Sequence, residues 1–134
     1  MIDLEEEKKA WREIKYRKKF SHALRGLYIF WKTTKNIHLV ALVGGALVVI
    51  ILGFYFRVSS LEWITLIFAI GFVFVTETIN TAIEIDIDLT SPEYHPYAKD
   101  TKDVAAAAVL LSVFVAIIVG LIVFLPKILL YVNI

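Results

Sequence analysis

The stretch WITLIFAIGFVFV at residues 63–75 runs directly into TETINTAIE at residues 76–84. A continuous apolar run of this kind predicts a membrane-spanning helix, because about 20 helical residues cross a hydrocarbon core of about 30 Å. The same helix then carries Glu77, Asn80 and Glu84, and Asp88 follows four residues later. Acids at the edge of a membrane cost free energy unless they face protein, water or a cation. The stretch therefore predicts a membrane fold and a polar site together.

The polar residues of this stretch share one face of the predicted helix. At about 100° of rotation per residue, Glu77, Asn80, Glu84 and Asp88 fall within an arc about 80° wide, whereas Asp86 points about 180° away. Each residue taken alone has an ordinary structural explanation, such as an ion pair with a lysine or a hydrogen bond between helices. Their common arc favours an occupied polar site, and function is expected there.

Composition places the chain among small membrane proteins. It has 134 residues, of which 59% are hydrophobic, a mean hydropathy of +0.74 and no cysteine, which excludes disulfides and thiol ligands. The predicted fold class is an all-α integral membrane protein with three transmembrane helices, at residues 39–56, 63–85 and 104–125. Pro126 is expected to end the third helix, and Asp100 or Thr101 is expected to cap its start.

Charge predicts the orientation in the membrane. Ten of the fourteen Lys and Arg residues precede the first span, and two lie between the second and third spans. Because positive residues are enriched in cytoplasmic loops, the N-terminus and the second loop are expected on the cytoplasmic side of the cytoplasmic (inner) membrane, together with the acidic face. The net charge of +1 gives no support for nucleic-acid binding.

Residues 1–36 are expected to form a cytoplasmic N-terminal segment, and residues 37–134 a three-span transmembrane domain that carries the function. An apolar stripe at helical spacing runs beside basic residues in the first segment and predicts an amphipathic helix on the membrane surface. The stripe comprises Phe20, Leu24, Leu27 and Trp31. For residues 1–12 a solvated helix or a disordered basic tail is the favoured alternative.

The acidic face and the start of the third span supply the parts needed for phosphoryl transfer to a lipid alcohol. Lys102 and Asp103 are expected to face the acids across the second loop. Carboxylate oxygens suit Mg²⁺, which is usually shared with substrate phosphates, and a lysine suits a phosphate oxygen. A carboxylate partly withdrawn from water can act as a general base toward a hydroxyl. Any nucleotide site must be built without a Gly-rich phosphate loop, because the sequence has no Walker or protein-kinase motif.

The three histidines, His22, His38 and His95, show no metal-ligand spacing and are interpreted as structural. Of the three, His95 lies in the loop that follows the acids.

Three segments resemble the prokaryotic diacylglycerol kinase family, and in particular its undecaprenol kinase branch. They are ETINTAIE at residues 77–84 with Asp88, SPEYHP at residues 91–96 and AKDTKDVAAAA at residues 98–108. The resemblance spans residues 18–127 and implies a homotrimer of three-span subunits with an N-terminal surface helix and active sites shared between subunits. It also implies an ATP- and Mg²⁺-dependent kinase that phosphorylates the hydroxyl of a membrane lipid alcohol. Undecaprenol is favoured over diacylglycerol, and the product would feed phospholipid or cell-envelope lipid-carrier metabolism.

Carried over to the matching positions, the resemblance makes Glu77 the catalytic base and Glu84 a magnesium ligand. It assigns to the ATP side Asn80, Asp88, Glu93, Tyr94, His95, Lys102 and Asp103. The chain departs from the family in KTTKN at residues 32–36, where Thr34 stands in the place of an expected metal-binding glutamate. Either another acid, a water or the Thr34 hydroxyl completes the metal shell, or catalysis is weakened.

The residues leave two alternative functions open. Thr34 would suit a catalytically weakened family member that acts as a binding or regulatory membrane protein. Glu77 would suit a small ion- or proton-coupled carrier, although the neighbouring Lys102 and Asp103 favour the kinase. The choice between undecaprenol and diacylglycerol lies outside what the residues predict, because apolar walls distinguish chain types by only about 1–3 kcal/mol.

Overall fold

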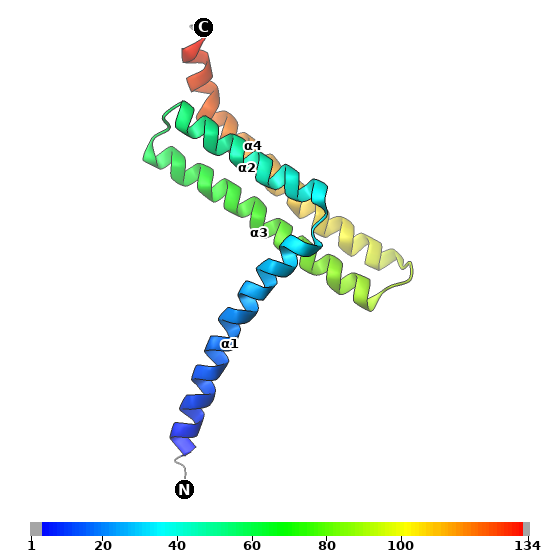
Figure 1. The fold of residues 1–134 in the computed structure, drawn as a ribbon. Coiled ribbons are helices and arrows are strands. Elements are labelled where there is room, and N and C mark those ends of the chain that lie inside the picture. The colour runs from blue at the N-terminus through cyan, green and yellow to red at the C-terminus, as the bar shows by residue number, and fades with distance from the viewer. Residues whose placement is uncertain (1–3, 133–134) are drawn as a thin grey trace. The chain divides into compact units, whose positions relative to one another are not determined.

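The computed structural model describes residues 4–132, and all the regular structure in this range is helical. Four helices follow one another along the chain (Figure 1). They are α1 (Leu4–Thr33), α2 (Asn36–Tyr55), α3 (Ser60–Thr90) and α4 (Pro96–Tyr131). The chain divides after Thr34 into two compact units, one containing α1 and the other containing α2 to α4.

The helices α2, α3 and α4 are each long and apolar enough to cross a membrane. The three-helix, all-α membrane fold expected from the sequence is thus confirmed, and the chain is a multi-pass membrane protein. At 31 residues, α3 is about 46 Å long and exceeds a hydrocarbon core of about 30 Å. One of its ends must therefore extend past the core, and the acids at positions 84–88 identify the C-terminal end as the one that does.

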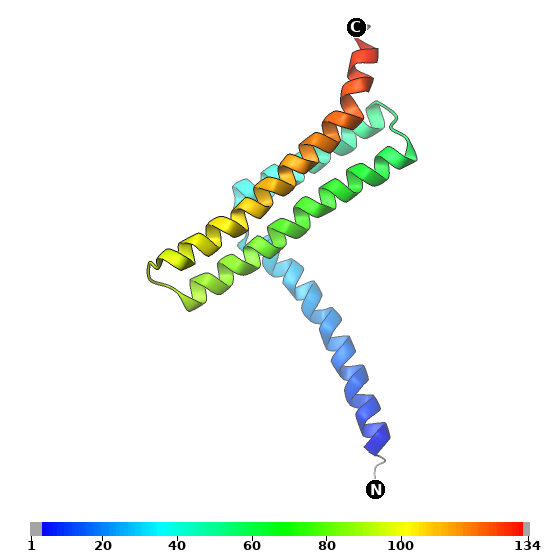
Figure 2. The ribbon, with the colours of Figure 1, turned by 180° about the vertical axis from the view of Figure 1, so that it is seen from behind.

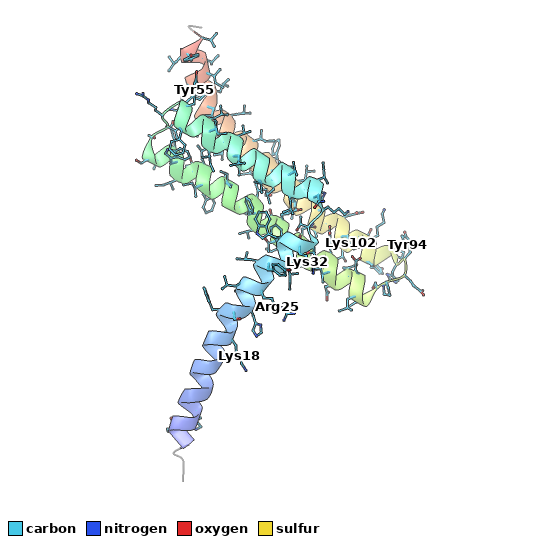
Figure 3. The ribbon with its side chains drawn as sticks, viewed as in Figure 1. Lys18, Arg25, Lys32, Tyr55, Tyr94 and Lys102 are labelled. Carbon is cyan, nitrogen blue, oxygen red and sulfur yellow. The ribbon has the colours of Figure 1, made fainter. Side chains whose placement is uncertain are left out.

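The first unit is one continuous helix, α1, which begins at Leu4. Of the alternatives for the first residues, a helix is therefore the one observed from this position onward. Figure 3 shows Lys18, Arg25 and Lys32 following one another along α1, as residues seven apart do on one helical face. Trp31, which lies about 100° around the helix from Lys32, is exposed as well. That α1 lies on a membrane surface stays a prediction.

A tight turn joins α2 to α3. Arg57 adopts a positive φ of 49°, which non-glycine residues rarely do. Ser59 then caps α3 through a reciprocal pair of hydrogen bonds. Its hydroxyl accepts the Glu62 backbone N–H at 3.4 Å, and the Glu62 carboxylate accepts the Ser59 N–H at 2.6 Å. The turn thereby satisfies two backbone donors that the start of a helix otherwise leaves without partners.

A group of buried apolar side chains lies near this turn. They form a small cluster with Trp63 packed against it, and its members are Val58, Leu66, Val123 and Phe124. Elsewhere most large apolar side chains are exposed, as expected for helices whose solvent is lipid rather than water.

The helices α3 and α4 lie side by side as an antiparallel hairpin (Figure 1 and Figure 2). One polar pair near each end and one in the middle fix the register between them. These pairs are Glu62 with Lys127 at 3.0 Å, Thr76 with Ser112 at 2.8 Å, and Asp88 with Lys102. The shorter α2 accompanies only part of this hairpin, so α3 and α4 continue beyond its beginning toward their connecting loop (Figure 1).

Two details of the predicted third span were wrong. The helix begins at Pro96 with His95 as its N-cap rather than near Asp100, because proline suits the first turn, where its missing N–H would have had no partner. It also continues through Pro126 to Tyr131 and changes direction toward its C-terminal end (Figure 2). A proline inside a helix removes one hydrogen bond and bends the axis, which membrane helices tolerate.

Candidate functional site

The polar face of α3 is built from local helical spacing. Glu77 and Asn80 are buried in the middle of the helix, each with 4% of its surface exposed. One turn after Asn80, the half-buried Glu84 carboxylate accepts a hydrogen bond from the Asn80 amide nitrogen at 3.1 Å. The predicted common face of Asn80 and Glu84 is thus confirmed, and Asp86, expected to point away from it, is exposed.

A histidine from another helix contacts this face. Nδ1 of His38, in the first turn of α2, lies 2.9 Å from Oε1 of Glu77. The Glu77 side chain is 6% exposed, whereas that of His38 is 48% exposed. The sequence analysis interpreted His38 as structural and did not predict this contact, although a histidine among the apolar residues that open the first span was a signal that could have found it. Buried polar groups in proteins nearly always have a hydrogen-bond partner, and His38 is that partner for the buried Glu77 carboxylate.

The start of α4 contacts the far end of the acidic face. The Lys102 ammonium donates a hydrogen bond to the Asp88 carboxylate, so the expected meeting of Lys102 with the acids is confirmed. Oδ2 of Asp103 instead lies 3.8 Å from Nζ of Lys99, one turn earlier on α4, and the Asp103 side chain is exposed. The two neighbours differ because consecutive residues of a helix point about 100° apart.

Glu93, Tyr94 and His95 lie in the loop between α3 and α4, and their side chains are exposed. Tyr94 is at the end of the hairpin beyond Lys102 (Figure 3). The His95 ring lies 5.7 Å from the Tyr97 ring, between centroids. These loop residues are accessible to a soluble ligand, in contrast to the buried Glu77.

An elongated groove of about 580 Å³ runs between α2, α3 and α4. Its polar lining consists of His38, Glu77, Asn80 and Glu84, and the rest of its wall is apolar. Along α3 the lining extends from Glu84 back to Ile70, which is about 21 Å of helix. The groove therefore joins a long apolar surface to carboxylates at one end, the combination that a long-chain alcohol with a terminal hydroxyl requires.

The oxygen donors at the polar end suit Mg²⁺. Glu84 and Asp88 supply carboxylates, and Oδ1 of the buried Asn80 makes no hydrogen bond within the described structure. Such an unsatisfied acceptor is suited to a cation or to a donor from a ligand. Among the side chains that the structure describes, no three acidic or histidine groups gather closely enough to enclose an ion. An ion held here would accordingly be shared with substrate phosphates, as is common for Mg²⁺.

The chain is similar to known undecaprenol and diacylglycerol kinases. The model of the prokaryotic diacylglycerol kinase family matches residues 21–124. Undecaprenol kinase of Bacillus subtilis strain 168 is 41% identical over 110 residues, which cover 82% of this chain and 88% of that protein.

Two diacylglycerol kinases are also similar. That of Helicobacter pylori strain 26695 is 43% identical over 67 residues, or 50% of this chain and 52% of that protein. That of Synechocystis strain PCC 6803 is 34% identical over 111 residues, or 82% of this chain and 62% of that protein. The matched region contains the whole of the acidic face, the groove and the start of α4.

Proposed function

The chain belongs to the prokaryotic diacylglycerol kinase family and is a membrane-bound lipid kinase, and on this premise we propose that it transfers the γ-phosphoryl group of ATP to the hydroxyl of undecaprenol. The position of the buried Glu77 at the polar end of an apolar groove carries the proposal. The similarity to an undecaprenol kinase over most of both chains favours that alcohol over diacylglycerol. The product would enter cell-envelope lipid-carrier metabolism, or phospholipid metabolism if diacylglycerol were used.

In the proposed reaction, Glu77 is the general base. It accepts the proton of the lipid hydroxyl while the hydroxyl oxygen forms a bond to the γ-phosphorus. The bond from the γ-phosphorus to the oxygen that bridges it to the β-phosphate breaks at the same time, and ADP leaves with that electron pair. A carboxylate that is 4% exposed suits this role, because little water competes with the hydroxyl for it.

The nucleotide is proposed to bind at the open end of the hairpin. Lys102 would contact phosphate oxygens, after exchanging its bond to Asp88 for one to ATP. Further contacts would come from Asn80, Glu93, Tyr94, His95 and Asp103. Glu84 would hold Mg²⁺, which supplies charge neutralisation on the phosphates when bound. All of these residues belong to the second unit of the chain, which supports a single site.

We further propose a homotrimer whose active sites are shared between subunits. Glu84 is only half-buried and Asp88 is exposed within one chain, so a neighbouring subunit would shield acids that one chain leaves open. The positive residues before α2 and in the first turns of α4 support placing this end on the cytoplasmic side of the cytoplasmic membrane, where ATP is available.

The deciding experiment is transfer of labelled phosphate from γ-labelled ATP to undecaprenol and to diacylglycerol, side by side in detergent micelles. We expect labelled undecaprenyl phosphate, formed faster than labelled phosphatidic acid and dependent on Mg²⁺. Faster labelling of diacylglycerol would overturn the proposed substrate. Absence of label in both lipids would overturn the proposed reaction and would favour a binding or regulatory role instead.

A further inference from the structure

The hydrogen bond between His38 and Glu77 joins two helices at the place where the proposed chemistry occurs. Its partners are 39 residues apart in sequence, and both line the groove. The backbone N–H of His38 donates to the Lys35 carbonyl at 2.9 Å, so the start of α2 anchors the histidine on its backbone side. Figure 1 shows that α2 begins alongside the middle of α3.

We infer that His38 is a positioning residue for Glu77, an inference that rests on the proposed function. An ionised carboxylate has no hydrogen to donate, so Nδ1 of His38 carries the hydrogen and donates it to Oε1 of Glu77. Oε2 is then the oxygen that receives the lipid hydroxyl. During transfer the hydroxyl proton moves to Oε2, while the Nδ1 hydrogen stays on His38.

The need for such a residue follows from the geometry of glutamate. The last torsion of its side chain has only broad preferences, so the plane of the carboxylate is not fixed by the rotamer alone. A general base must nevertheless present its oxygen within about 2.6–3.2 Å of the hydroxyl. One hydrogen bond from a rigid helix fixes that plane, since Glu77 itself is held in the middle of α3.

Two other roles of His38 lead to different expectations. In a reversed dyad the imidazole would be the base and Glu77 would orient it, as in serine hydrolases. As a purely structural contact, His38 would only hold α2 against α3. Substitutions that keep or remove a donor at the Nδ1 position separate these roles.

The test compares His38→Asn, His38→Gln and His38→Ala in the labelled-phosphate assay. Asparagine places its amide nitrogen at the same number of bonds from Cβ as Nδ1, whereas glutamine places it at the distance of Nε2. We expect the alanine and glutamine variants to lose about tenfold to a hundredfold in kcat, with little change in KM for ATP or lipid. The asparagine variant should keep kcat close to the native value. His22→Asn, in α1, is the control and should leave kcat unchanged.

Several results would overturn the inference. If His38→Asn is as slow as His38→Ala, the imidazole itself is required and the reversed dyad is favoured. If His38→Ala keeps native kcat, the histidine has no role in catalysis. If all three variants lose thermal stability in proportion to their activity, the contact is structural. Should His38→Ala fail to fold, the kcat of His38→Asn compared with that of His38→Gln still tests the inference, because both variants carry a polar amide at position 38.

A second measurement does not depend on activity. In a spectrum of the ¹⁵N-labelled histidine side chains, assigned with the His38→Asn variant, we expect His38 to carry its hydrogen on Nδ1, because the partner of one ring nitrogen fixes the tautomer. Glu77→Ala should remove that preference. Finding the hydrogen on Nε2 in the native chain would overturn the inference. If the native chain labels no lipid, the proposed function fails, and this spectrum still decides whether the His38–Glu77 donor geometry exists.

Discussion

The indole ring of Trp63 lies directly against Gly53, so that a Cβ atom on Gly53 would come within 2.5 Å of the ring. The ring of Phe54 lies 5.0 Å from the same indole, between centroids, and limits its freedom to move. The contact between Gly53 and Trp63 packs α2 against α3 beside the turn that joins them. It lies at the end of the groove opposite to the acids. The absence of a side chain at Gly53 therefore sets how closely the two helices approach.

Gly53→Ala is expected to destabilise the second unit. Overpacking of a close contact typically costs about 1–3 kcal/mol, and here the added methyl must displace an aromatic ring. The free energy of unfolding, measured by SDS titration in mixed micelles, checks this. Gly44→Ala in the same helix is the matched control, because nothing lies within 4 Å of its Cβ position. Equal losses in the two variants would contradict the close-packing role of Gly53.

Glu77→Gln should abolish most phosphoryl transfer while leaving the fold and nucleotide binding largely intact. The amide keeps the shape of the carboxylate but accepts no proton, and general-base catalysis is worth about 10²- to 10⁴-fold. The rate of lipid phosphorylation at saturating ATP and the dissociation constant for ATP are the two quantities to compare. Retention of most native turnover would remove Glu77 as the base.

Glu84→Ala should mainly weaken Mg²⁺-dependent nucleotide binding, because it removes the proposed metal carboxylate. Asp86→Ala is the matched control, since Asp86 is an exposed acid two residues away that does not share the face of Glu84. We expect the apparent affinity for Mg·ATP to fall more in Glu84→Ala than in the control. The assignment fails if both substitutions change that affinity equally.

Thr34→Glu should restore the carboxylate that the family resemblance leads us to expect. If the metal centre lacks one ligand, the added oxygens should lower the Mg²⁺ concentration needed for half-maximal activity. A Mg²⁺ titration at fixed ATP measures this for the native chain and the variant. Thr33→Glu, at the neighbouring position on α1, controls for the added charge. An unchanged or raised Mg²⁺ requirement in Thr34→Glu would contradict the hypothesis that the metal centre lacks one ligand. That result is expected if Asp88 already serves as the ligand.

Features that depend on one helix alone could be predicted from the sequence. Hydropathy located the three spans, and the period of the helix placed Asn80 and Glu84 on one face, where a 3.1 Å hydrogen bond joins them. Both follow from local rules, since the bilayer selects apolar segments of a fixed length and the helix repeats every 3.6 residues. Helix ends were less predictable. Pro126 was expected to stop α4, yet the helix continues to Tyr131.

Features that depend on two helices were decided only by the tertiary structure. The contact of His38 with Glu77, the close approach of Gly53 to Trp63 and the groove between the helices all require a particular rotation and register of one helix against another. In a membrane, lipid solvates an apolar face as well as a neighbouring helix does, so hydropathy does not say which faces meet. Close packing at small residues and polar pairs between helices select the arrangement, because they occur in one register and are lost in the others.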